Sequence, residues 1–192
     1  GLLSTTDYSG ENTYMDLNFK SVSSVGDDID DDQIKILEAK GYFYNVEVAA
    51  KTANTPAMLL NTVSTSPYDE TFSSVVAVDA YYIGLQNVLF NVLTSKPNYP
   101  QTPDGQQIAI SATDSYSETW ITNGFLGDRL ITNPVTGQKN YVTRGYITKT
   151  KPEDVYKISA EERSKRKIAP IEQFIYPSGS TWIIPIIENV QL

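Results

Sequence analysis

The sequence predicts an α+β fold, in which two long helices cover a mixed β-sheet and a smaller β-rich lobe follows, ending in an extended C-terminal strand. Three observations predict this fold. Apolar and polar residues alternate in several short segments, which is typical of half-buried strands. In the middle of the chain apolar residues recur at helical spacing over two long stretches. Finally, 40% of the 192 residues are hydrophobic, which is enough for one sizeable core.

We expect the chain to divide after residue 124. Residues 1–124 form an α+β core with the order strand-helix-strand-strand-helix-helix. Residues 125–192 form the β-rich C-terminal lobe, with a short helix at 159–167 and a terminal arm strand at 182–190.

Three strands and a short helix are predicted in the first part of the core. Period-two alternation places the strands at about 13–20, 42–49 and 57–64. Between the first two strands, Asp30 or Asp31 is a suitable N-cap and Gly41 a suitable stop. These signals predict a helix over roughly residues 31–40.

The two long helices come next. Between Phe72 and Thr94 a broad apolar stripe predicts the central packing helix, through Val75, Val78, Tyr82, Leu85, Leu89 and Val92. The second helix begins at Thr102-Pro103, a cap followed by proline in the first turn, and ends at Asn123-Gly124.

The last part of the chain has shorter elements. Turn signals predict a hairpin around 138–148, and Ser159 with Glu162 forms a capping-box pattern that begins the short helix. The terminal segment alternates in a strand register, yet it contains Pro185, which cannot donate to a strand ladder. We therefore expect that strand at a sheet edge, at a bulge, or paired by an unusual route.

Composition excludes several kinds of chemistry. The chain has no Cys and no His, so disulfides, thiolate nucleophiles, Ser-His-Asp triads and imidazole or thiolate metal sites are ruled out. The aspartates at 27–32 lack the spacing of a calcium loop. We expect no enzyme, no catalytic residue, no metal and no cofactor. A formal net charge of -8 argues against nucleic acid or an anionic membrane as partner.

Charge is distributed unevenly. Residues 1–96 hold 5 Lys+Arg and 13 Asp+Glu, whereas residues 97–192 hold 10 of each. Opposite patches on one chain permit a charged head-to-tail contact between copies, and solvated helix ends are the simpler interpretation. The candidate charged interface consists of Arg163, Lys165, Arg166, Lys167, Asp27, Asp28 and Asp31.

A second hypothesis uses the aromatic residues. Thirteen Tyr and two Trp would suit a monomeric binding module for carbohydrate or a protein ligand. Several of them fall in the predicted core register instead, namely Tyr44, Tyr82, Tyr116 and Trp120.

Four stretches of the sequence also carry a resemblance to a known family. They are LNFKSVSSV with AKGYFYNVEV, VVAVDAYYIGLQNVLFNVL with PNYPQTPDGQ, TNGFLG, and ERSKRKIAPIEQFIYPSGSTWIIPIIENV. In this order, from Tyr14 to Asn189, the sequence resembles the conserved C-terminal part of the tail sheath proteins of contractile-tail bacteriophages.

The resemblance implies a virion structural protein. Such a subunit polymerises helically around the tail tube and contracts by rigid-body rearrangement during DNA ejection. Its partners would be copies of itself, the tail tube protein, and the baseplate and tail terminator proteins. It would be found in the phage tail, and in the host cytoplasm during assembly. No cofactor is implied.

The resemblance also implies how copies join. Sheath subunits link by β-augmentation, in which terminal arms of neighbours complete a sheet. In this chain the corresponding arm would comprise Trp182, Ile183, Ile184, Ile186, Ile187 and Val190. An ordinary edge strand within the same chain is the alternative interpretation.

Overall fold

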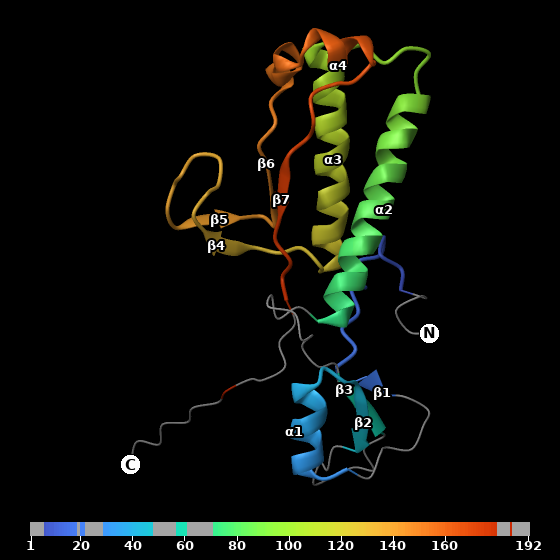
Figure 1. Cartoon of the computed structure of the whole chain (residues 1–192), viewed down its shortest axis with the longest axis vertical. Coiled ribbons are helices and arrows are strands. Elements are labelled where there is room, and N and C mark those ends of the chain that lie inside the picture. The colour runs from blue at the N-terminus through green and yellow to red at the C-terminus, as the bar shows by residue number, and fades with distance from the viewer. Residues whose placement is uncertain are drawn as a thin grey trace. The chain divides into compact units, whose positions relative to one another are not determined.

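The computed structural model describes residues 6–18, 20–21, 29–47, 57–60, 71–179 and 185. The chain divides into two compact units, whose elements are labelled in Figure 1. Unit 1 consists of residues 1–14 and 76–178, and unit 2 of residues 15–75 and 179–192. Residues 15–75 of unit 2 thus interrupt the sequence of unit 1. The boundary that we predicted after residue 124 lies inside unit 1.

Unit 2 contains a short helix and a small antiparallel sheet. The strands β1 (Lys20–Ser21), β2 (Tyr44–Glu47) and β3 (Ala57–Leu60) pair in the order β1-β3-β2. The helix α1 (Asp31–Ala39) follows Asp30, whose side chain accepts hydrogen bonds from two backbone N–H groups of the first turn. The Tyr44 hydroxyl donates to Glu38 Oε1 at 2.6 Å and ties β2 to α1.

Two long helices run through unit 1. α2 (Phe72–Thr94) begins in unit 2 and belongs to unit 1 from Val76 onward. α3 (Pro103–Asn123) is capped by the Thr102 side chain, which accepts from the Gly105 N–H, and it ends at Gly124 with φ of 93°. Both helices lie where the sequence predicts them, because their end signals are local.

Strands of unit 1 form two separate antiparallel pairs. β4 (Arg129–Ile131) pairs with β5 (Tyr141–Thr143), and β6 (Tyr146–Thr148) pairs with β7 (Gln173–Ile175). The hairpin predicted over 138–148 is therefore wrong, since β5 and β6 are neighbours in sequence but pair with different strands. Gly145, with φ of 110°, turns the chain between them.

Two short helical elements lie between β6 and β7. They are a 3-10 helix, η2 (Pro152–Lys157), and α4 (Ala160–Ser164), which begins after the predicted cap Ser159. α4 ends earlier than predicted, because Lys165 caps it and Arg166 adopts a left-handed φ of 61°.

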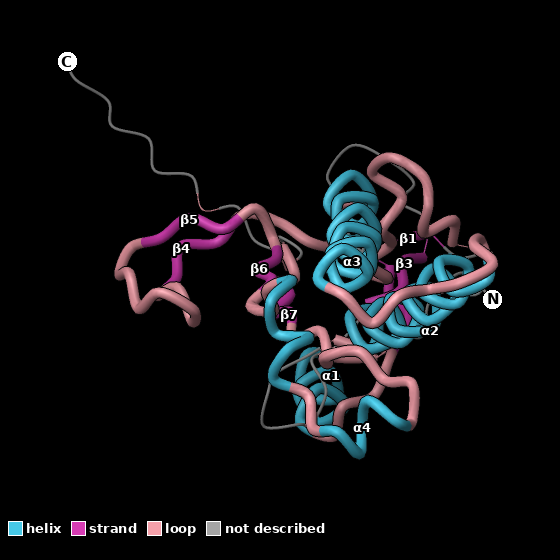
Figure 2. Tube along the Cα trace, turned by 90° about the horizontal axis from the view of Figure 1, so that it is seen from above, coloured by secondary structure: helices cyan, strands magenta, loops and turns pink. Residues whose placement is uncertain are grey.

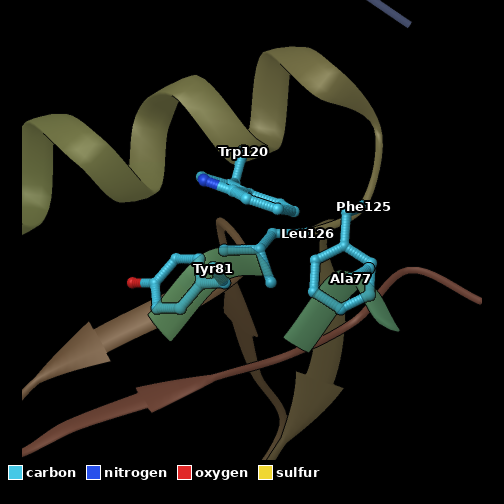
Figure 3. Close-up of a cluster of buried hydrophobic side chains, with 5 residues drawn as sticks. All are labelled: Ala77, Tyr81, Trp120, Phe125 and Leu126. Atoms are coloured by element: carbon cyan, nitrogen blue, oxygen red, sulfur yellow. The ribbon is translucent and has the colours of Figure 1, made fainter. Parts of the chain in front are cut away.

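The core of unit 1 is an aromatic cluster between α2 and the C-terminal end of α3. Figure 3 shows Trp120 facing Tyr81, Phe125 and Leu126, with Ala77 beside them. The Trp120 ring lies edge-on to both Tyr81 and Phe125, at centroid distances of 5.4 Å and 5.5 Å. This is a favourable geometry for aromatic pairs, so the cluster joins α2 to α3.

The N-terminal segment closes one end of this core. Backbone N–H groups of Asn12 and Tyr14 donate to the Thr122 and Asn123 carbonyls, at 2.9 Å and 3.1 Å. Tyr8 stacks on the outer side of Trp120, at a centroid distance of 5.2 Å. Residues 13–18 form no strand, contrary to the sequence prediction, and the described strand β1 begins only at Lys20.

The predicted α+β class is confirmed, with differences in detail. All strand pairs in the described residues are antiparallel and form three small sheets, so the expected single mixed sheet is not seen there. The sheet of β1, β2 and β3 belongs to unit 2. In unit 1, α3 contacts β6, and the Tyr81 hydroxyl of α2 donates to Gln173 of β7. The predicted arm strand 182–190 lies outside the described residues, apart from Pro185.

Within the described residues, α2 is the one helix whose length and composition would permit it to cross a membrane. Of the 18 residues in its most apolar stretch, only 11% are buried. The buried residues Ala77 and Tyr81 join α2 to the core of unit 1. The remaining apolar residues of α2 are considered below.

We predict that Gly105→Ala destabilises unit 1, although alanine favours helices. A Cβ at residue 105 would lie 2.0 Å from the Pro100 carbonyl oxygen, which is backbone and cannot rotate away. The free energy of unfolding should fall by about 1–3 kcal/mol, the usual cost of overpacking. Urea denaturation measures it. Ser115→Ala, at an exposed position of α3, is the control and should change stability little; equal effects would contradict the prediction.

Candidate functional site

An open groove of about 940 Å³ is the main concave feature of unit 1. It is bounded by α2, by α3 and by the segment 166–175, which includes β7. In Figure 2, α3 lies in the upper part of the view, with α2 below it on one side and β7 below it on the other. The lining residues are mostly apolar, so the groove suits an extended apolar segment better than a charged small molecule.

The α2 wall consists of the residues that the sequence assigned to the core. Leu85, Leu89 and Val92 line the groove and are half-buried. Tyr82 also lines it and is 55% exposed, which contradicts its predicted burial. The buried face of α2 instead carries Ser73, Ala77 and Tyr81. A large part of the predicted core stripe is therefore a surface that the described part of the chain leaves open.

The opposite wall is held by glutamine side chains of the α3 region. Gln106 is fully buried, and its amide pairs with the backbone of Ala169 through two hydrogen bonds of 3.0 Å. Gln101 Nε2 donates to the Lys167 carbonyl at 2.6 Å. Because these bonds satisfy the backbone of an irregular segment, they fix residues 167–169 as a rigid wall.

A buried polar network lies beneath β7. The Tyr81 hydroxyl lies 2.8 Å from Ser117 Oγ and donates to Gln173 Oε1 at 2.8 Å. Gln173 Nε2 in turn donates to Asp114 Oδ1 and Thr148 Oγ1, at 3.2 Å and 3.0 Å. Burial raises the pKa of Tyr81, so its hydroxyl keeps its proton at neutral pH and remains a donor. The network connects α2, α3, β6 and β7.

The β7 strand has one free edge within the described part of the chain. Its backbone pairs with β6 on one side, and the sheet contains no further strand. Residues 171–173 and Ile175 line the groove. An unpaired edge beside an apolar groove is the arrangement to which an extended segment can add as a strand.

The predicted basic cluster separates into internal and external residues. Arg163 donates to the Val155 carbonyl at 2.9 Å and to the Gln101 carbonyl at 3.4 Å. These hydrogen bonds lie within the chain, so Arg163 stabilises the fold. Lys165 forms an ion pair with Glu161 on α4. Arg166 and Lys167 are exposed and line the groove together with Glu162.

The remaining candidate residues lie elsewhere. Asp31 is exposed in the first turn of α1, in unit 2. Asp27 and Asp28 lie outside the described residues, as do the arm residues Trp182, Ile183, Ile184, Ile186, Ile187 and Val190. Among the described residues there is no group of three or more Asp, Glu, His or Cys that could hold a metal ion.

Sequence reasoning missed Gln101, Gln106 and Gln173. A glutamine is usually exposed, so a periodicity analysis counts it as polar surface. The one available signal was the row of Ala109, Thr113 and Ser117 on α3, a face of small residues at helical spacing where another chain segment can approach closely.

Comparison with protein-family models and with curated proteins found no match. Among solved structures, the chain is similar to one in the cryo-EM structure of the anti-feeding prophage baseplate, with a TM-score of 0.59 and 14% identity. The two share a fold. The match covers 91% of this chain and 44% of that baseplate chain.

We predict that Arg163 stabilises the folded chain and that Lys167 contributes little to its stability. Arg163→Ala should lower the free energy of unfolding by about 1–3 kcal/mol, because two backbone carbonyls lose a charged donor. Lys167→Ala is the matched control and should change it by less than about 0.5 kcal/mol, as exposed substitutions usually do. Chemical denaturation of both variants checks the difference, and a destabilised Lys167→Ala with a stable Arg163→Ala would contradict it.

Proposed function

We propose that this chain is a structural subunit of a phage-tail-like particle, and that it acts by binding further copies of itself. The observation that carries the proposal is the groove of unit 1, with its free β7 edge. The fold likeness to a chain of the anti-feeding prophage baseplate supports the class of particle. In finer detail, we propose a tail sheath role, which the sequence resemblance supports.

The proposed link is a strand from a neighbouring copy. Residues 182–190 of one copy would add to β7 of the next, with alternate side chains directed at Leu85, Leu89 and Val92. Arg166 and Lys167 at the same groove suit the single acidic residue of that segment, Glu188. Four or five ladder bonds contribute only about 1 kcal/mol each, so many copies in register are needed for a stable tube.

In this proposal the chain transforms no molecule. The folded units move nearly rigidly while the linking segments keep copies connected, and contraction exchanges one set of contacts for another. The tail tube, baseplate and terminator proteins would be the other partners. No catalytic residue, cofactor, membrane or nucleic acid is required.

Deleting Trp182–Leu192 tests the linking segment. We expect a folded monomer with unchanged circular dichroism that no longer assembles, because the groove loses its occupant. Negative-stain microscopy and sedimentation velocity provide the readouts. Assembly of the deletion variant to the extent of the parent would exclude the linking role of this segment.

A groove variant tests the same contact from the other side. Leu89→Glu places a charge in the apolar wall and should abolish assembly as the deletion does. Ser115→Glu is the control, since it adds the same charge at an exposed position of the neighbouring helix α3, outside the groove. If both variants assemble equally well, the groove is not the acceptor.

Charge reversal at Arg166 and Lys167 should weaken assembly more at low salt than at high salt, because exposed ion pairs are screened. Light scattering over a range from low to high salt, in which the screening length falls from about 20 Å to about 4 Å, measures how assembly depends on salt. Arg163 is left unchanged because its hydrogen bond to the Val155 carbonyl stabilises the fold. If assembly of the variant and of the parent depends on salt equally, Arg166 and Lys167 are solvated surface residues and take no part in the contact.

A further inference from the structure

Unit 1 has a second exposed apolar surface, which lies outside the groove. The β4–β5 hairpin directs one cross-strand pair, Leu130 and Val142, to solvent, and these side chains are 64% and 61% exposed. Val135 at the turn is exposed as well. The other face of the hairpin is turned inward, since Thr143 is buried. An apolar pair displayed on a projecting hairpin is unusual for a protein surface. We call Leu130, Val135 and Val142 the hairpin patch.

A complementary surface lies on α2. Ile83 and Phe90 are 61% and 64% exposed, occupy one face of the helix, and do not line the groove. They are separated by seven residues, about 10 Å along the helix axis at 1.5 Å per residue. A directly opposed strand pair has its Cα atoms about 5 Å apart, so Leu130 and Val142 can seat between Ile83 and Phe90. We call Ile83 and Phe90, with the nearby Asp79, the α2 patch.

The charges of the two patches are opposite. Residues 129–144 carry Arg129, Lys139 and Arg144 and contain no acidic residue. Arg144 forms a 2.8 Å ion pair with Glu118, and its side chain is still 75% exposed. α2 contains a single charged residue, Asp79, and its last turn has no cation to offset the negative end of the helix dipole. A basic hairpin is therefore attracted to this helix.

The two patches cannot meet within one copy. The hairpin and α2 lie on opposite sides of α3 and the β6–β7 pair in both views (Figures 1 and 2). We propose that the hairpin patch of one copy docks on the α2 patch of a second copy. Because the two surfaces differ, the contact is head-to-tail and can repeat without closing. It rests on the proposed self-assembly and uses residues other than the groove and segment 182–190.

This contact is weak by itself. A stable interface buries about 800 Å² on each partner, and two small patches of a few side chains cannot supply that area. Its effect therefore depends on a second link between the same copies, which raises the effective concentration of the hairpin at α2. The contact should form in the assembled state and be nearly absent from the dilute monomer.

Cysteine cross-linking tests the contact in the full chain, which contains no cysteine of its own. One copy carries Leu130→Cys and a second carries Phe90→Cys, and the two are mixed under assembling conditions with a short bis-maleimide. We expect at least about tenfold more cross-linked heterodimer than from random encounter, because thiols held together have a high effective concentration. Tyr156→Cys mixed with Phe90→Cys is the control, since Tyr156 is 68% exposed and lies in neither patch.

The outcomes separate this contact from the proposed function. Assembled particles whose Leu130–Phe90 yield equals the Tyr156 control overturn the contact and leave the function standing. A chain that neither assembles nor cross-links overturns both. A cross-link in a chain that forms no particles supports the contact, overturns its dependence on a second link, and counts against the tail role. As a second measurement, Asp79→Lys should reduce the yield and Lys139→Asp should restore it in the partner copy; failure of both overturns the charge pairing.

Discussion

The contact of Tyr81 with Trp120 decides how the rest of unit 1 is arranged. It joins the middle of α2 to the C-terminal end of α3, and the Tyr81 hydroxyl continues into the network that holds Gln173 of β7. Beyond this point, Leu85, Leu89, Val92 and Leu93 of α2 are only partly covered by the described part of the chain and form one wall of the groove. One aromatic contact thus fixes both the core and the opening beside it.

Local signals predicted the helices well. The Asp30 and Thr102 caps and the stop at Gly124 act within one turn, so sequence alone locates the ends of α1 and α3. Strand pairing was not predictable in this way. β5 and β6 are separated by two residues, Arg144 and Gly145, and their partners are set by contacts with distant segments. Pairing over long sequence separation leaves no local pattern to read.

The candidate site was mispredicted for a related reason. Hydrophobicity assigns an apolar stripe to the core, yet α3 buries Gln106, Thr113 and Ser117 because each finds a hydrogen-bond partner. On α2, by contrast, the apolar residues Leu85, Leu89 and Val92 line the groove, and Ile83 and Phe90 are exposed in the α2 patch. Likewise, Arg163 looked like part of an external cluster, and only the carbonyls of Val155 and Gln101 reveal its internal role.

The weakness of each proposed contact is consistent with the proposed particle, in which copies would rearrange. A strand added at β7 forms a few ladder bonds worth about 1 kcal/mol each, and the hairpin contact buries less area than a stable dimer needs. Acting together between the same copies, the two raise each other's effective concentration and make a long array stable. Because neither is strong alone, the hairpin contact can exchange for another while the strand stays in place. A single large interface at the same total affinity would hold the copies in one arrangement, so division of the binding energy between two surfaces is what permits a change of state.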